Sequence, residues 1–154
     1  EDNDRVCINN PLVLKDGHYE MDFADMERKI IDNHVKMFIL CSPHNPVGRV
    51  WTKEELTNVI AICKRHNVLI ISDEIHCDFV YPGYEHTMLP VVAEDYLERI
   101  VVCTAPSKSF NLAGLQLSHI FIPDENMREA FHKELMKIPY DESGAGGLVA
   151  GRAA

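Results

Sequence analysis

Four runs of mostly apolar residues are spaced along the chain, at positions 36–42, 68–72, 100–105 and 116–123. In the runs at 68–72 and 100–105, the apolar residues are continuous instead of alternating with polar ones, and β-branched side chains are frequent. Continuous runs of this length are typical of strands that are buried on both faces. The pattern therefore predicts four strands of one buried sheet.

Two segments, one before the first run and one between the first two runs, carry the apolar spacing of amphipathic helices. The first, residues 22–32, has a candidate cap in Asp22. The second opens at a capping box, in which Thr52 and Glu55 stand three residues apart, and extends to about His66. The apolar faces of the two helices consist of Phe23, Met26 and Ile30, and of Leu56, Val59, Ile60 and Cys63.

Further elements are predicted toward both ends of the chain. Residues 5–22 predict an extended pair around a "DG" turn. Residues 91–100 and 124–138 predict helices, and "DESGAGG" near the end predicts a turn before the start of another helix. The side chains expected to face inward on the helix over 124–138 are Met127, Ala130, Phe131 and Leu135.

The order of these elements favours one class of fold. Apolar strands that alternate with helices predict an α/β domain with a largely parallel sheet. In such folds, ligands bind beyond the carboxyl ends of the strands. Three polar clusters follow directly after three of the predicted strands: "SPHNPVG", "SDEIH" and "APSKSFN". We therefore expect these clusters to meet at one edge of the sheet.

Composition narrows the possible partners. The 154 residues carry a net charge of -9 with no basic run, which argues against a nucleic-acid surface. No apolar run is long enough to cross a bilayer, so no membrane partner is expected. The five cysteines are scattered, and most lie in apolar segments, which predicts free thiols in a cytoplasmic protein. Because the chain starts without Met and stops inside a predicted helix, we expect a piece of a longer protein.

The three clusters offer complementary chemistry. Asn45 supplies an amide and Asp73 a fixed negative charge, while Lys108 supplies an amine that desolvation makes nucleophilic. Ser107 and Ser109 supply hydroxyls suited to phosphate oxygens. A lysine for a Schiff base, an aspartate for a pyridinium nitrogen and hydroxyls for a phosphate together describe a site for pyridoxal 5'-phosphate.

Each of these residues also has a structural explanation. Lys108 fits a solvated loop lysine, Asp73 a cap carboxylate and Asn45 a turn former. His76, in the second cluster, fits a packing histidine equally well. Neither His76 with Cys77 nor His44 with Cys41 has the spacing of a zinc site, so no metal is expected.

The quoted segments resemble those of fold-type I pyridoxal-phosphate enzymes, the aminotransferase class I/II superfamily. More narrowly, "DEIHCDFVYPGYEHT" and "SKSFNLAGLQ" are similar to the cystathionine β-lyase branch of C–S lyases, the MalY/PatB class. The resemblance covers nearly the whole chain. It implies a three-layer large domain of the pyridoxal-phosphate transferase fold, of which residues 1–154 form a part. A phosphate loop before this part and a small domain after it are implied to lie outside the chain.

The resemblance also implies residue roles. Lys108 would attach the cofactor and shuttle protons, Asp73 would pair with the pyridine nitrogen, and Asn45 would bind the phenolic oxygen. Ser107 would contact the phosphate, with Ser109 as a further candidate. His76 stands where many aminotransferases of this fold place a tyrosine. That exchange is what favours the lyase branch.

One position departs from the wider fold. Gln116 stands eight residues after Lys108, where many aminotransferases place an arginine that binds the phosphate. The charge of the phosphate must then be balanced elsewhere, in the missing sequence or the partner subunit. A direct analogy with aspartate aminotransferase is weakened.

Three functions follow as hypotheses. The leading one is a cytoplasmic, homodimeric C–S β-lyase that converts sulfur amino acids such as L-cystathionine to pyruvate, ammonia and a thiol. The second is an aminotransferase on the same scaffold, and the third a cofactor-binding regulatory homologue without turnover. In each case, residues 1–154 alone are expected to be inactive.

Overall fold

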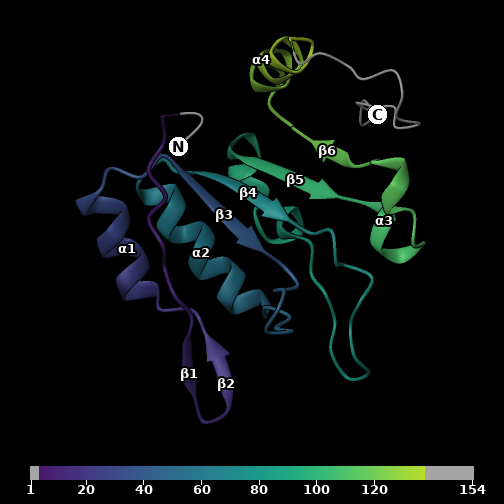
Figure 1. The fold of residues 1–154 in the computed structure, drawn as a ribbon. Helices are drawn as coiled ribbons and strands as arrows, with labels where there is room; N and C mark the ends of the chain where they lie inside the picture. Colours follow the sequence, from purple (N-terminus) through teal and green to yellow (C-terminus); the bar gives the residue numbers. More distant parts are fainter. Residues whose placement is uncertain (1–3, 138–154) are drawn as a thin grey trace.

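The computed structural model describes residues 4–137, and a four-stranded sheet forms its centre (Figure 1). The strands lie in the order β3 (Met37–Cys41), β4 (Leu69–Asp73), β5 (Ile100–Thr104) and β6 (His119–Phe121). The first three run parallel, and β6 pairs antiparallel with β5 at the edge. The mostly parallel α/β sheet predicted from the sequence is therefore confirmed.

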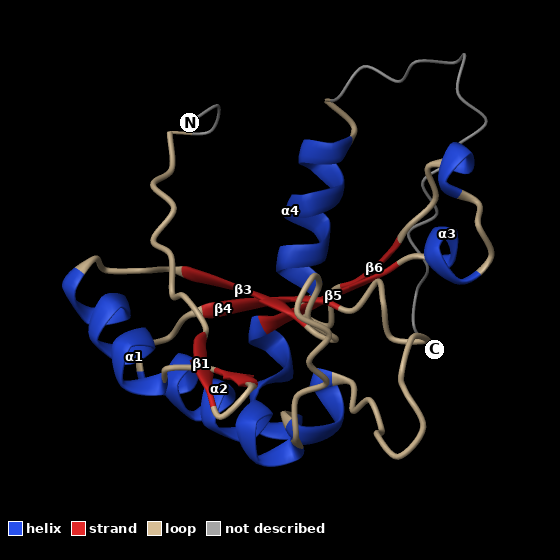
Figure 2. Ribbon diagram, turned by 60° about the horizontal axis from the view of Figure 1, so that its bottom comes forward, coloured by secondary structure: helices blue, strands red, loops and turns tan. Residues whose placement is uncertain are grey.

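The two faces of the sheet are covered differently. The helices α1 (Phe23–Asp32) and α2 (Lys53–Arg65) lie against one face, and α4 (Glu125–Leu135) rises on the opposite side (Figure 2). This arrangement agrees with the predicted three layers. Alternate strand residues point to opposite faces, so Leu40 and Ile70 face α2 and are buried, whereas Ile39 on the other face is 65% exposed.

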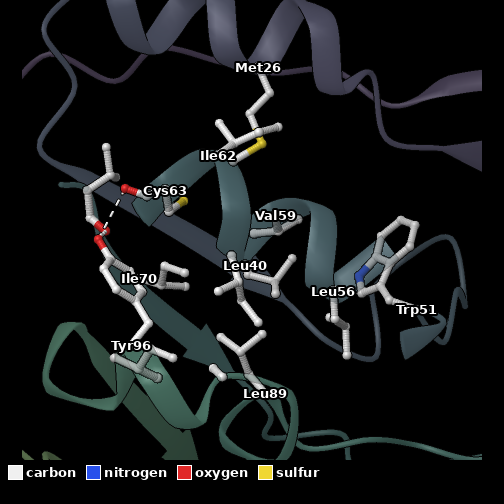
Figure 3. Packing of buried hydrophobic residues seen from close by; sticks show 14 of the residues in the cluster. Met26, Leu40, Trp51, Leu56, Val59, Ile62, Cys63, Ile70, Leu89 and Tyr96 are labelled. Atoms are coloured by element: carbon white, nitrogen blue, oxygen red, sulfur yellow. Dashed lines mark hydrogen bonds between the residues drawn. The ribbon is translucent and has the colours of Figure 1, made fainter. Parts of the chain in front are cut away.

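A single apolar cluster joins the sheet to α1 and α2 (Figure 3). Leu56, Val59 and Cys63 on α2 are fully buried there, as their helical spacing predicted. Burial raises the pKa of the Cys63 thiol to about 12, which keeps it protonated. All five cysteines of the chain are free thiols, in agreement with the sequence. Other members of the cluster are Met26, Leu40, Trp51, Ile62, Ile70, Leu89 and Tyr96.

The helix starts are determined by their caps. The Asp22 side chain accepts a hydrogen bond from the Asp25 backbone N–H and begins α1. At α2, Thr52 Oγ1 accepts from the Glu55 N–H, and the Glu55 carboxylate accepts in return from the Thr52 N–H at 2.8 Å. Both donors would otherwise lack a partner inside the helix. Both caps were predicted correctly.

Replacing Thr52 with alanine is expected to lower the free energy of unfolding by about 1 kcal/mol, because the cap of α2 is lost. Thr57 is a matched control on the same helix, since it is exposed and its hydroxyl donates to the Lys53 carbonyl. Thr57→Ala should change the free energy by less than about 0.5 kcal/mol. Urea unfolding of the two variants checks this, and equal effects would contradict the role of the cap.

The extended pair near the start of the chain is a hairpin. The strands β1 (Val13–Lys15) and β2 (His18–Glu20) pair antiparallel, with Asp16 and Gly17 between them. Both turn residues have positive φ, +49° and +82°, which suits the right-handed twist of a two-residue hairpin. The "DG" signal therefore predicted this turn correctly.

Other predictions need correction. The segment expected to be one helix over 91–100 contains two short 3-10 helices, η1 (Leu89–Val92) and η2 (Glu94–Arg99). The strand expected over 116–123 is limited to β6, because Gln116 adopts a left-handed conformation with φ +51°. The turn and helix expected from "DESGAGG" onward lie outside the described residues.

The face of α4 differs from its prediction as well. Met127 and Leu135 are half-buried, but Ala130 and Phe131, which were expected to face inward, are exposed. The reason is that α4 stands apart from the cluster around α1 and α2 (Figure 1). Within residues 4–137, no helix is long and apolar enough to cross a membrane.

Candidate active site

The carboxyl ends of β3, β4 and β5 meet at one edge of the sheet, as expected. Asp73 is the last residue of β4, and it pairs in register with Cys41 on β3 and Cys103 on β5. Residues in register across parallel strands point to the same face. The Asp73 side chain is therefore flanked by two cysteines.

Asp73 is half-buried and lightly hydrogen-bonded. Its Oδ1 accepts from the Ile75 backbone N–H at 3.4 Å, which is a long bond. The pKa of the Cys103 thiol is raised, mainly by desolvation and to a smaller extent by the negative charge of Asp73. The Cys103 thiol is therefore neutral. With one long hydrogen bond to its side chain, Asp73 retains lone pairs for an outside donor.

Asn45 and His76 come together from two different loops. Asn45 Nδ2 lies 3.5 Å from His76 Nε2. The loop of Asn45 is held to the sheet by Cys41, whose Sγ accepts from the Asn45 backbone N–H at 3.4 Å. Asn45, to which the resemblance gives the phenolic oxygen of the cofactor, and His76 thus lie side by side.

Arg49, which was not singled out in the sequence, supports the Asn45 loop. Its guanidinium donates to both carboxylate oxygens of Glu55, at 2.6 and 2.8 Å, and also to the Tyr19 carbonyl. It also lies over the Trp51 ring, 4.6 Å from the centroid. Arg49 therefore ties the β1–β2 hairpin and the start of α2 to the loop that carries Asn45. An arginine six residues before the capping-box glutamate was the only hint in the sequence.

Lys108 lies on α3 (Pro106–Ser109), a short helix directly after β5. Its side chain is exposed, and Ser107 beside it is half-buried. The Ser109 hydroxyl donates to the Asp78 carboxylate, which ties α3 to the loop after β4. Because that hydroxyl proton is already engaged, Ser107 is the better placed of the two serines to donate to a phosphate.

A cavity of about 640 Å³ opens beside these loops. Its walls come from the β1–β2 hairpin, the segment 43–50 and the loop after β4. Asn45, His76 and Asp78 line it, whereas Asp73, Ser107 and Lys108 do not. Burial lowers the pKa of His44, another lining residue, which favours its neutral form. The structure thus brings Asn45 and His76 to a cavity and leaves the other candidates outside its lining.

The set of donors and acceptors fits pyridoxal phosphate. Asp73 offers a carboxylate with spare lone pairs, Asn45 and His76 offer nitrogen donors 3.5 Å apart, and Ser107 and Lys108 offer a hydroxyl and an amine on one helical turn. A pyridine nitrogen, a phenolic oxygen, a phosphate and an aldehyde require these groups. Residues 4–137 contain no cluster of three or more His, Cys, Asp or Glu side chains that could hold a metal ion.

Comparison with known families agrees with this fold. The family model described as aminotransferase class I and II matches residues 6–151. The chain belongs to this family.

Particular relatives include a cystathionine β-lyase. Cystathionine β-lyase PatB of Bacillus subtilis strain 168 is 45% identical over 150 residues, which are 97% of this chain and 38% of that protein. Protein MalY of Escherichia coli K12 is 34% identical over 85% of this chain and 33% of that protein. The structure of cystalysin from Treponema denticola, which contains pyridoxal 5'-phosphate, superposes with a TM-score of 0.86 at 39% identity, over 94% of this chain and 37% of that one. The chain therefore spans about a third of the length of these relatives, 33% to 38%.

Proposed function

We propose that the whole protein is a pyridoxal-phosphate-dependent C–S β-lyase that acts on sulfur amino acids such as L-cystathionine. The observation that carries this proposal is the pairing of His76 with Asn45 at the cavity. The similarity to PatB over 97% of the chain supports it. Hydrolytic cleavage of L-cystathionine would yield pyruvate, ammonia and homocysteine.

The residues of this chain divide the work of binding and proton transfer. Asp73 would accept a hydrogen bond from the protonated pyridine nitrogen. Asn45 and His76 would donate to the phenolic oxygen, and Ser107 would donate to the phosphate, with Ser109 held by Asp78 behind it. When bound, pyridoxal phosphate supplies an electron sink for the carbanion at the substrate α-carbon.

Lys108 would act twice. Its Nζ would first hold the cofactor covalently, and the substrate amine would displace it. The freed Nζ would then take the proton from the substrate α-carbon as a general base. The C–S bond would break with its electron pair leaving on the sulfur, and the proton held by Lys108 would be available to the thiolate. Hydrolysis of the three-carbon remainder gives pyruvate and ammonia.

Borohydride trapping in the full-length protein tests the attachment. Reduction of the pyridoxal-phosphate-loaded protein, followed by peptide mass spectrometry, should place the added mass on Lys108. Lys53, which is exposed at the start of α2, is an internal control and should stay unmodified. Label on another lysine, with Lys108 unlabelled, would contradict the assignment.

An aminotransferase is the second candidate, and the description of the family model favours it. In both reactions Lys108 would remove the α-proton of the substrate. In the lyase the C–S bond would then break, whereas in the transferase it would stay intact. A transferase needs a keto acid to accept the amino group, whereas the lyase does not. Turnover of L-cystathionine that depends on added keto acid would select the transferase. Cofactor binding without turnover of any amino acid would select a regulatory homologue.

The remaining parts of the proposal concern the whole protein. Residues 1–154 would form part of the large, cofactor-binding domain, with a phosphate loop before it and a small domain after it. The protein would be a cytoplasmic homodimer. The isolated chain would be inactive, and its turnover after purification would contradict this.

A further inference from the structure

Glu74 is a carboxylate that lies entirely inside the protein, with no exposed surface. It follows Asp73 directly, so strand alternation turns the two side chains to opposite faces of the sheet. Asp73 faces the site, and Glu74 faces the core on the same side as Ile70 and Ser72, which are both buried. A buried carboxylate is costly unless hydrogen bonds compensate it.

Three donors compensate Glu74. Its Oε1 accepts from the Ser72 hydroxyl at 2.8 Å and from the Leu89 backbone N–H at 3.0 Å. Its Oε2 lies 2.8 Å from Nε2 of His86, whose side chain is only 8% exposed. A carboxylate oxygen is an acceptor, so Nε2 carries the proton that is shared. His86 and Leu89 both lie at the far end of the loop that begins after Glu74.

That loop, residues 75–88, extends away from the sheet after β4 (Figure 1). Its backbone hydrogen bonds in the described part of the chain form local turns, such as Tyr84 N–H to the Tyr81 carbonyl at 3.1 Å. It carries His76, and it supplies Asp78 and aromatic residues to the cavity wall. The contacts of Glu74 join the two ends of this loop inside the core.

We propose that Glu74 and His86 form a positioning pair that holds the 75–88 loop closed and thereby places His76 beside Asn45. Neither Glu74 nor His86 lines the cavity. It acts through the loop. The competing explanation is that burial of Leu89, which is 1% exposed, anchors the loop without help.

Two substitutions at His86 separate these explanations. His86→Leu keeps an apolar body but removes the donor to Glu74, whereas His86→Gln retains an N–H at a similar reach. Chymotrypsin cleavage after Phe79, which is exposed, reports opening of the loop in the full-length protein without cofactor. Loss of a hydrogen bond to a buried charged group should raise the cleavage rate about tenfold or more in His86→Leu. His86→Gln should stay near the wild-type rate.

Glu85→Gln is the matched control, since Glu85 is exposed in the same loop and its substitution should leave cleavage unchanged. Thermal unfolding, measured in parallel, identifies any variant that opens because the whole protein has unfolded. Cleavage of folded His86→Leu at the wild-type rate would overturn the proposal. Equal acceleration in His86→Leu and His86→Gln would also overturn it, because the donor would then be irrelevant.

A spectroscopic readout connects the pair to His76 and rests on the proposed function. In the full-length protein loaded with pyridoxal phosphate, His86→Leu should weaken the circular dichroism of the cofactor band, and His86→Gln should restore it. An unchanged band in His86→Leu with an open loop would overturn the link to His76. A wild-type protein that binds no cofactor would instead refute the proposed function, while the cleavage result would stand.

Hydrogen exchange of the wild-type protein keeps the proposal testable if His86→Leu does not fold. The Leu89 amide, which donates to Glu74, should exchange as slowly as core amides of β4 such as that of Ile70. The Tyr81 amide at the loop tip should exchange at least about a hundredfold faster. Fast exchange at Leu89 would contradict a closed pair.

Discussion

Replacing Lys108 with alanine in the full-length protein is expected to reduce turnover of L-cystathionine by at least about 10³-fold. A positioned general base contributes about 10²–10⁴-fold on its own, and the same substitution would remove the proposed covalent anchor of the cofactor. Since the Lys108 side chain is exposed on a short helix, its loss should leave the fold intact. Steady-state pyruvate release, measured with saturating pyridoxal phosphate, gives the ratio.

Lys53→Ala is the control for this experiment, because Lys53 is also exposed, at the start of α2, and does not line the cavity. It should leave turnover unchanged. The absorption band of the Schiff base should also disappear in Lys108→Ala, even where the cofactor stays bound. Retention of most of the activity would remove Lys108 from the mechanism, and retention of the band would place the attachment on another lysine.

Replacing Asp73 with asparagine is expected to lower kcat by about 10²–10³-fold, the usual effect of removing one electrostatic partner from an active site. In the proposed site, the negative charge of Asp73 would keep the pyridine nitrogen protonated, whereas a neutral amide would not. Asparagine retains an oxygen for the long bond from the Ile75 N–H, so the end of β4 should keep its shape. The loss is therefore expected in chemistry and not in stability.

The measurement for Asp73→Asn is kcat together with the free energy of unfolding. Asp32→Asn is the matched control, because the Asp32 side chain is 58% exposed on α1 and forms a surface ion pair with Arg28. It should change neither quantity by a measurable amount. A threefold or smaller effect of Asp73→Asn on kcat would show that the charge is supplied by another residue.

The elements whose signals are local could be predicted from the sequence. The capping box at Thr52, the cap at Asp22 and the "DG" turn depend on side chains within a few residues of each other, and all three were predicted correctly. Predictions that depend on distant partners were less successful. The inward side of α4 was assigned from its spacing alone, but which side is buried depends on what packs against the helix, and Phe131 is exposed.

The candidate site also combines features that the sequence predicted with features that depend on distant partners. The sequence predicted that the clusters carrying Asn45 and His76 would meet, because the carboxyl ends of neighbouring parallel strands lie at one edge of the sheet. The two side chains do lie close together. The hydrogen bond from Ser109 to Asp78 was not predicted, since it joins loops 31 residues apart. The burial of Glu74 could have been predicted from the sequence, because one of two adjacent carboxylates at the end of a buried strand must point into the core. Its partner His86 could not be found without the path of the loop.

Pyruvate release from L-cystathionine by the complete gene product, with pyridoxal phosphate and without any keto acid, tests the central claim most directly. A C–S β-lyase should release pyruvate, ammonia and homocysteine in equal amounts over many turnovers. Absence of pyruvate, with transfer of the amino group once a keto acid is added, would contradict a lyase and leave the pairing of His76 with Asn45 without diagnostic value.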